Sequence, residues 1–402
     1  MSEHPSTTGT RTRRVRRAAV LAAMLAVSLL AIACEPAPVN DTIPSNVGPG
    51  NEHGWFQAGL RWQGDFGDPT VVRVGSTYYA YSSPTGGRYL PVLTSTDLTN
   101  WTIHPNWSPI PAEILASNQS DGDKRNLNDG LVAAPGWGLP NTTTGPWITR
   151  DLWAPGVFQI GSTWYAYHAV RVSFAGDDPN NLGRFCLTVS SASSPLGPFR
   201  DQSFGTPIQC QDASTDPSGS IDPSPFHDPT TGKDYLLFKA AGKIGVRESA
   251  IMSVELGSNG KPLPGAVPVK LLETNRADAW EGGTIENPSM VRYNGHTYLF
   301  YSANSSFAGP NNISPYATGY ALCDNGPQVP CGRPGTTPLF SSGGLQQGPG
   351  GSSGFVTADN QLRVAYATYW YGDPRTPAPR RLHIAAIAQN PDGTLVTTGA
   401  VS

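Results

Sequence analysis

The stretch from Ile285 to Asn304 reads I-E-N-P-S-M-V-R-Y-N-G-H-T-Y-L-F-Y-S-A-N. Two short runs rich in aliphatic and aromatic residues flank the pair Asn294–Gly295, which favours the tight turn of a β-hairpin. Glu286 stands just before the first run, so the predicted hairpin carries a carboxylate at its entrance. Similar phrases recur along the chain, and this hairpin therefore indicates the architecture of the whole.

Four more copies of the hairpin phrase are present. They read D-P-T-V-V-R-V-G-S-T-Y-Y-A-Y-S-S (68–83), A-P-G-V-F-Q-I-G-S-T-W-Y-A-Y-H-A (154–169), D-P-S-P-F-H-D-P-T-T-G-K-D-Y-L-L-F-K-A (222–240) and a degenerate G-S-S-G-F-V-T-A-D-N-Q-L-R-V-A-Y-A-T-Y-W (351–370). Starts at 68, 154, 222, 287 and 351 lie 86, 68, 65 and 64 residues apart. Repeats that each have room for about four strands predict a radially repeated sheet. We predict an all-β fold, a five-bladed β-propeller, in preference to a two-sheet sandwich.

The composition agrees with many turns and short strands. Gly (45 residues) and Pro (38) are abundant, and charged residues make up only 14% of the chain. The sequence shows no sustained apolar period of 3.6 residues, and this argues against an α/β fold. A strand between Trp55 and Trp62 is expected to close the ring, and 381–388 to be the outer strand of blade five. The insertion 105–150 is too long for an idle loop, and we expect it at the rim of the cleft.

The N-terminus has the pattern of a targeting segment. Five arginines between 11 and 17 precede an apolar run from Ala18 to Ala33, which is shorter than a membrane-spanning helix needs and ends at Cys34. This arrangement resembles a bacterial lipoprotein signal with Cys34 as the lipidated residue, and ordinary secretion after Ala33 is the alternative. We assign 1–33 to a signal peptide, 34–53 to a flexible tether and 54–402 to the propeller. The mature protein is expected outside the cell, secreted or anchored to the outer face of the membrane.

The net charge limits the kinds of binding partner, and the cysteine content indicates disulfides. Removing residues 1–33 takes away five basic residues and one acidic residue, which leaves 22 basic and 29 acidic residues and a net charge of −7. A basic nucleic-acid surface is therefore not expected, an uncharged partner fits better, and we expect a monomer. In an exported protein the four remaining cysteines favour disulfides. Their spacing suggests the pairs Cys186–Cys210 and Cys323–Cys331, and no zinc-type spacing is present.

Acidic residues stand at the starts of three predicted blades. The first strand of each blade lines the central channel of a propeller, so we expect Asp68, Asp222 and Glu286 to converge on one axis. Asp-Pro is also common turn chemistry, but three acids at equivalent positions in a weakly charged chain favour a functional site. Cleavage of an acetal needs one protonated carboxylic acid and one ionised carboxylate, which predicts a glycoside hydrolase.

The phrases F-G-D-P-T-V-V, D-L-W-A-P, S-I-D-P-S-P-F and I-E-N-P-S-M-V resemble the blade signatures of glycoside hydrolase family 43 over about residues 62–388. This resemblance implies a five-bladed propeller that cleaves arabinose- or xylose-containing polysaccharides with inversion. It also implies that Asp68 is the general base, Asp222 the acid that modulates pKa, and Glu286 the general acid. Glu281, in W-E-G-G, is a rival acid that we expect instead on the rim or paired with an Arg.

Further residues follow from the same resemblance. Phe66 and Trp153 flank matched motifs and are candidate apolar platforms for a sugar, with blade core as the alternative for Trp153, and His168 is a candidate at the channel. Relatives carry G-P-G-H in blade five, where the His helps to hold an ion or water. Here Gly351 takes that place, so we expect no obligatory calcium or other metal.

The sequence therefore predicts an exported inverting glycosidase acting on arabinofuranosyl or xylosyl linkages. The alternative is a surface lipoprotein that binds glycans on a propeller without turnover. A third candidate is a related five-bladed fructosidase, against which the absence of its usual opening motif counts. The sequence does not decide between arabinose and xylose as the sugar, or between exo and endo attack. It also does not decide whether Cys34 is lipidated.

Overall fold

In a computed structural model the chain divides into two compact units, Met1–Asn46 and Val47–Ser402. The structure describes residues 60–62, 64–112, 114, 126–138, 152–172, 184–212, 214–243, 245–373 and 377–400, all in the second unit. The predicted signal peptide, the tether and Cys34 lie outside the described residues. Within those ranges, no helix has the length and apolar character needed to cross a membrane.

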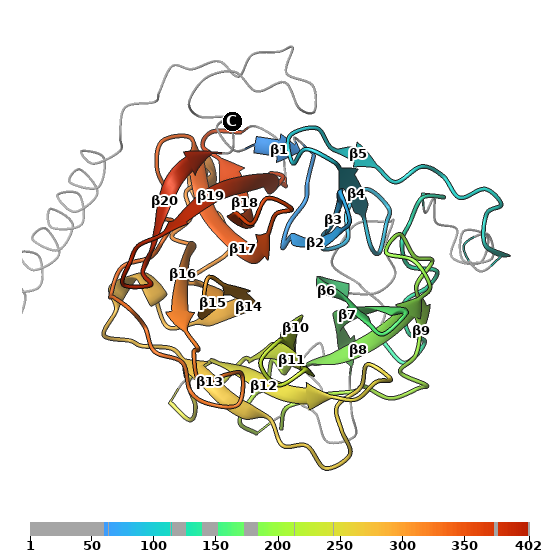
Figure 1. Ribbon diagram of the computed structural model, residues 1–402, viewed down its shortest axis with the longest axis horizontal. Helices are drawn as coiled ribbons and strands as arrows, with labels where there is room; N and C mark the ends of the chain where they lie inside the picture. The colour runs from blue at the N-terminus through green and yellow to red at the C-terminus, as the bar shows by residue number, and fades with distance from the viewer. Residues whose placement is uncertain are drawn as a thin grey trace, which may run out of the picture. The chain divides into compact units, whose positions relative to one another are not determined.

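The described strands form five antiparallel sheets in a ring, which confirms the predicted five-bladed propeller (Figure 1). Blade one contains β2 (Thr70–Val74), β3 (Thr77–Tyr81), β4 (Val92–Ser95) and β5 (Thr102–Ile103). Blade two contains β6 (Leu152–Ile160), β7 (Thr163–Val172), β8 (Arg184–Ala192) and β9 (Arg200–Asp201). Blade three contains β10 (Ser220–Asp228), β11 (Lys233–Ala240), β12 (Ala250–Leu256) and β13 (Val269–Glu273). Blade four contains β14 (Ile285–Tyr293), β15 (His296–Ala303) and β16 (Ala317–Leu322).

Blade five is completed by both ends of the propeller. Its order is β1 (Leu60–Trp62), β19 (Arg381–Gln389), β18 (Leu362–Trp370) and β17 (Gln346–Val356), and β20 (Leu395–Ala400) also pairs with β19. The described part of the expected N-terminal strand thus closes the ring, as predicted. The segment 381–388 lies inside the sheet, in β19, because β1 and β20 share its outer edge. Its assignment as the outer strand is corrected.

The hairpin that revealed the repeat forms as expected. Strands β14 and β15 pair from Ile285–Ala303 to Tyr293–His296. The turn residues Asn294 and Gly295 have φ of 42° and 89°, the left-handed backbone that a two-residue hairpin turn requires. The inner strands β2, β6, β10, β14 and β17 surround the central space (Figure 1).

The core consists of five hydrophobic clusters, one at each junction between neighbouring blades. Side-chain alternation along a strand explains this arrangement. On β11, Leu236 and Phe238 pack toward blade two, whereas Tyr235 and Leu237 pack toward blade four. Every sheet is therefore buried on both faces, and the ring holds its inner strands in fixed mutual positions.

The long insertion after β5 contributes to one of these junctions. Leu131 is buried in the cluster between blades one and two, and Trp137 packs against it. The Asp129 carboxylate accepts hydrogen bonds from the backbone N–H groups of Tyr89, Leu90 and Leu131. This part of the insertion is packed structure, while 115–125 and 139–150 lie outside the described residues.

Candidate active site

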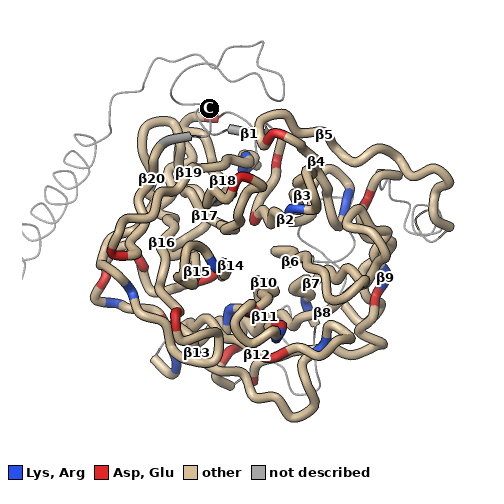
Figure 2. The backbone as a smooth tube through the Cα atoms, viewed as in Figure 1, with Lys and Arg blue, Asp and Glu red and all other residues tan. Residues whose placement is uncertain are grey.

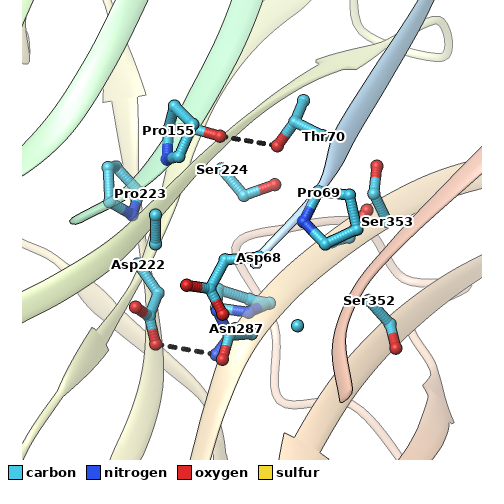
Figure 3. Close-up of a pocket in the computed structure, with 14 residues that line it drawn as sticks. Asp68, Pro69, Thr70, Pro155, Asp222, Pro223, Ser224, Asn287, Ser352 and Ser353 are labelled. Atoms are coloured by element: carbon cyan, nitrogen blue, oxygen red, sulfur yellow. Dashed lines mark hydrogen bonds between the residues drawn. The ribbon is translucent and has the colours of Figure 1, made fainter. Parts of the chain in front are cut away.

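Each inner strand enters the channel through the same backbone distortion. At the channel, a residue from each blade has a left-handed φ: Asp68 (51°), Ala154 (45°), Asp222 (58°), Asn287 (46°) and Gly351 (64°). In blades two to five the strand register shifts next to this residue, as at a β-bulge. Asp, Asn and Gly tolerate this backbone conformation better than most residues. The five residues line one hollow of about 20 Å³, room for about one water molecule (Figure 3).

This geometry corrects one detail of the sequence prediction. Asp68 and Asp222 occupy equivalent positions, but the equivalent residue of blade four is Asn287, and Glu286 precedes it by one. Trp153 holds the same place in blade two, one residue before Ala154. The carboxylates of Asp68 and Asp222 still lie together near Asn287 (Figure 3), and Glu286 joins them through the contacts below.

Asp68 is held by a guanidinium from another blade. Arg380, just before β19, donates from Nη1 to Oδ1 at 2.7 Å and from Nη2 to Oδ2 at 2.9 Å. The Ser83 hydroxyl donates to Oδ2 at 2.7 Å and accepts a hydrogen bond from the backbone of Ala154. Burial alone would raise the pKa of Asp68, but Arg380 and Ser83 outweigh it and hold the pKa below its usual value. Asp68 is therefore ionised at neutral pH.

Asp222 experiences the opposite environment. Burial, followed by the negative charge of Glu286, raises its pKa to about 7, while Lys239 acts in the other direction. Its Oδ2 accepts a hydrogen bond from the backbone N–H of Asn287 at 2.9 Å. Figure 2 shows charged residues of both signs beside the central space as well as on the outer loops. Below about pH 7, Asp222 therefore holds a proton.

Both oxygens of Glu286 have partners. Lys239 on β11 donates from Nζ to Oε2 at 2.7 Å, and the Tyr316 hydroxyl lies 2.7 Å from Oε1. The Tyr316 oxygen also lies 2.6 Å from Oδ1 of Asn287. Burial opposes the charge of Lys239, but Glu286 and Asp222 raise its pKa, so the ammonium group persists. Asp222, Lys239 and Glu286 thus form one electrostatic unit.

Glu281 does not belong to this unit. It is buried in the short helix η3 (Ala279–Glu281), where Arg333 contacts both carboxylate oxygens at 2.7 and 3.0 Å. The Tyr301 hydroxyl and the backbone N–H of Asn275 complete its hydrogen bonds. Of the two predicted alternatives, the rim or a pairing with an Arg, the structure shows the pairing, and Glu281 is fully buried.

The three candidate substrate contacts have different surroundings. Phe66 is 1% exposed in the cluster between blades one and five, so it presents no face to a ligand, and that prediction is corrected. His168 is fully buried and does not line the hollow, and burial lowers its pKa to about 3, which keeps it neutral. Its candidate role is likewise corrected. Trp153 is 38% exposed and stacks on Phe185 with ring centroids 4.3 Å apart.

Four residues of the site escaped the sequence analysis: Arg380, Lys239, Tyr316 and Asn287. The sequence does contain a signal for Lys239, because a single Lys inside the apolar run Y-L-L-F-K-A predicts a buried charge with a partner. It contains no such signal for Arg380, since 312 residues separate Arg380 from Asp68. Both predicted disulfides, Cys186–Cys210 and Cys323–Cys331, are present.

A sequence model of the glycosyl hydrolases family 43 matches residues 133–395, which is more than half of the chain. The chain belongs to glycosyl hydrolases family 43. Family 43 membership makes it a glycosidase and argues against the non-catalytic alternative. The match begins after blade one, so Asp68 lies outside it, and the assignment of Asp68 depends on the geometry above.

A curated relative and several solved structures resemble this chain over most of its length. An extracellular endo-α-(1→5)-L-arabinanase of Bacillus subtilis (strain 168) is 25% identical over 315 residues, covering 77% of this chain and 82% of the relative. A thermostable family 43 glycoside hydrolase superposes with a TM-score of 0.62 at 25% identity, covering 84% of this chain and 94% of the other. An α-L-arabinofuranosidase from Lactobacillus brevis shares the fold, with a TM-score of 0.59 at 19% identity and coverage of 82% and 93%.

The resemblance to family 43 also raised the question of a channel calcium. Gly351 supplies no side-chain ligand, and a Cβ atom placed there would lie 2.8 Å from both Cα and Oδ1 of Asp68. Among the residues that the structure describes, no group of three His, Cys, Asp or Glu side chains is arranged to hold a metal ion. The side chains present do not fit such an ion, and no step below uses one. That the enzyme needs no metal stays a prediction.

Proposed function

We propose that this protein is an exported, inverting glycosidase that hydrolyses α-L-arabinofuranosyl linkages in arabinan or arabinoxylan, with xylosyl linkages as the second choice. The arabinanase of Bacillus subtilis supports the choice of sugar. One observation carries the mechanism: Arg380 keeps Asp68 ionised, whereas burial and the charge of Glu286 raise the pKa of Asp222 to about 7, so that a proton is held on the opposite side of the hollow. A single displacement needs this pairing of one base with one acid.

In this mechanism Asp68 is the general base and Glu286 the general acid. Glu286 gives its proton to the glycosidic oxygen as the bond between that oxygen and the anomeric carbon breaks. A water molecule attacks the opposite face of that carbon and gives a proton to Asp68, so the released sugar is inverted. Before the bond breaks, the proton that Asp222 holds below about pH 7 moves to Glu286, and the negative charge left on Asp222 then keeps it there. Solvent removes the proton from Asp68 after the reaction.

Trp153 is the proposed platform for a sugar ring. Its indole is partly exposed, and Phe185 supports one side of it. The apolar face of a sugar packs well on such a ring. Trp153 and Glu286 occupy matching backbone positions in blades two and four, each one residue before a residue that lines the hollow, and this supports placing the platform on the same side as the acid.

Export and anchoring complete the proposal. We assign residues 1–33 to a signal peptide, 34–53 to a tether that lifts the propeller from the membrane, and Cys34 to lipidation. The extracellular location of the Bacillus subtilis relative supports export. Labelling with a fatty-acid probe tests lipidation, since a Cys34→Ala variant loses the label and enters the medium if Cys34 is the anchor.

The test of the function uses Asp68→Asn and Glu286→Gln with debranched arabinan, branched arabinan, arabinoxylan and xylan oligomers as substrates. We expect reducing-sugar release from an arabinose-containing substrate by the wild type and a loss of roughly 10²–10⁴-fold in each variant. Glu281→Gln is the control, because Glu281 is a buried Glu outside the hollow. Proton NMR of the first product should show the inverted anomer. Wild-type turnover in both variants, or a retained anomer, contradicts the proposal.

A further inference from the structure

We propose that Tyr316 and Asn287 form a hydrogen-bond relay that holds the catalytic proton on Oε1 of Glu286, so that both are positioning residues for the general acid. This inference rests on the proposed function, which makes Glu286 the acid. It adds two residues to the proton-handling side of the site that no sequence pattern singled out.

Tyr316 is held rigidly against the inner strand of blade five. It lies just before β16, is 3% exposed, and its backbone N–H donates to the Ser314 hydroxyl. Its ring lies so close to Gly350 that a Cβ atom there would come within 2.0 Å of Cε1. Only Gly at position 350 leaves room for the ring, and the phenol oxygen is therefore fixed between Glu286 and Asn287.

Counting hydrogens shows which state of Glu286 this arrangement fits. The Tyr316 oxygen lies 2.7 Å from Glu286 Oε1 and 2.6 Å from Asn287 Oδ1, yet a phenol carries one hydrogen. Burial raises the pKa of Tyr316 well above 10, and a charge on Glu286 raises it further, so the phenol keeps that hydrogen in either state of Glu286. If Glu286 is ionised, one of the two short oxygen contacts has no hydrogen. A proton on Oε1 completes both, with Glu286 donating to Tyr316 and Tyr316 donating to Asn287.

The same two residues can also hydrogen-bond the ionised form of Glu286 if the Asn287 amide group rotates by 180°. Rotation of the Asn287 side chain brings its NH₂ group to Tyr316, which then donates its hydrogen to the Glu286 carboxylate. The backbone of Asn287 stays fixed meanwhile, because its N–H bonds Asp222. The charged groups facing Glu286 are Lys239 and Asp222, with the Asp68–Arg380 pair beyond them. Lys239 bonds only Oε2 and leaves the relay on Oε1 free to change state.

Two substitutions remove the relay without altering the backbone. Tyr316→Phe removes the hydroxyl from a ring of the same shape. Asn287→Ala removes the amide and keeps a residue that tolerates the left-handed backbone, as Ala154 does at the equivalent position of blade two. Tyr301→Phe is the matched control: Tyr301 is a buried tyrosine of the same blade whose hydroxyl donates to Glu281.

The experiment compares nitrophenyl and phenyl glycosides of whichever arabinose unit or oligomer the wild type accepts. Nitrophenolate leaves with little help from an acid, whereas phenolate and a sugar need the proton. We expect Tyr316→Phe and Asn287→Ala to lower kcat on the phenyl glycoside by roughly 10–100-fold and on the nitrophenyl glycoside by less than about threefold. Glu286→Gln should show the same contrast more strongly, and Tyr301→Phe should show none.

The outcomes separate the two proposals. If Glu286→Gln slows both glycosides equally, Glu286 is not the acid and the proposed function fails with the relay. Suppose instead that Glu286→Gln slows the phenyl glycoside more than the nitrophenyl glycoside. If both relay variants then slow the two glycosides equally, or slow neither glycoside, Tyr316 and Asn287 have a purely structural role. Thermal melting of each variant confirms that the folded enzyme is compared.

Discussion

On the blade-one side of the hollow, Asp68 receives two hydrogen bonds from Arg380 and one from Ser83. On the side of blades three and four, the negative charge of Glu286 acts on Asp222, and Lys239 is a counter-charge to both. The first arrangement lowers the pKa of Asp68, and the second raises the pKa of Asp222 to about 7.

The comparison shows that residues from other blades decide the role of each carboxylate. Asp68 and Asp222 share the residue type, the following proline and the left-handed backbone. They differ in what the neighbouring blades supply: a guanidinium in one case, a second carboxylate in the other. Two carboxylates with separated pKa values are the requirement for combined acid and base catalysis.

The largest expected effect comes from removing the ionised carboxylate. Asp68→Asn keeps the shape of the side chain but cannot accept a proton from water at neutral pH. We expect kcat on arabinan oligomers to fall by roughly 10³–10⁴-fold with little change in KM. Steady-state kinetics on the purified variant measures this. A loss below tenfold would remove Asp68 from the mechanism.

Replacing the counter-charge of Asp68 tests the same side more gently. Arg380→Met leaves Asp68 buried without its guanidinium, which raises the pKa of Asp68 and protonates the base at higher pH. We expect the acidic limb of kcat/KM to move to higher pH and activity at pH 6 to fall by roughly 10–100-fold. Arg333→Met is the control, since Arg333 pairs with the buried Glu281. An equal shift of the limb in both variants contradicts the account.

Stability should depend on pH with opposite sign on the two sides. The folded state raises the pKa of Asp222 from 3.8 to about 7, so folded protein binds the proton more tightly than unfolded chain and loses stability as pH rises from about 4 to 7. Asp222→Asn should therefore gain about 2–4 kcal/mol over wild type between pH 4 and pH 8.

For Asp68 the sign reverses, because its folded pKa is lowered. Its ionised form contributes stability above the unfolded pKa, and that contribution disappears as pH falls through the folded pKa. Asp68→Asn should thus cost more stability at pH 7 than at pH 3. Urea unfolding at several pH values measures both variants. If the stability change caused by the two substitutions varied with pH in the same direction, the contrast between the two sides of the hollow would be disproved.

The smallest expected effect concerns the sugar platform. Trp153→Ala removes the ring of the proposed platform, and we expect KM for arabinan oligomers to rise about 5–30-fold with kcat nearly unchanged. Phe204→Ala is the control, since Phe204 is 76% exposed in the loop after the outermost strand β9. If both variants raise KM equally, Trp153 is no subsite.

The sequence was sufficient for the fold because the repeated unit is local. A hairpin phrase such as 285–304 contains its own turn, its own alternation and its own acid, and five copies determine the ring. The convergence of Asp68, Asp222 and Glu286 followed from the rule that first strands line the channel. Family 43 signatures then supplied the roles that the spacing alone did not.

The contacts between blades could not be read in this way. Whether an aromatic residue beside a motif is buried, like Phe66, or exposed, like Trp153, depends on the packing of a neighbouring blade. The pairing of Arg380 with Asp68 joins the last blade to the first, and it exists only once the ring is closed. The one-residue offset of Glu286 from the bulge became visible only from the backbone angles.

The most direct test of the central claim is the pH dependence of kcat/KM for wild type and Asp222→Asn. In the wild type, burial and the charge of Glu286 raise the pKa of Asp222 to about 7, so the site loses its proton and the alkaline limb should fall near pH 7. In Asp222→Asn that carboxyl group is absent while Lys239 remains beside Glu286, and the limb should move to lower pH by about one unit or more. An alkaline limb at the same pH in both proteins would contradict the account.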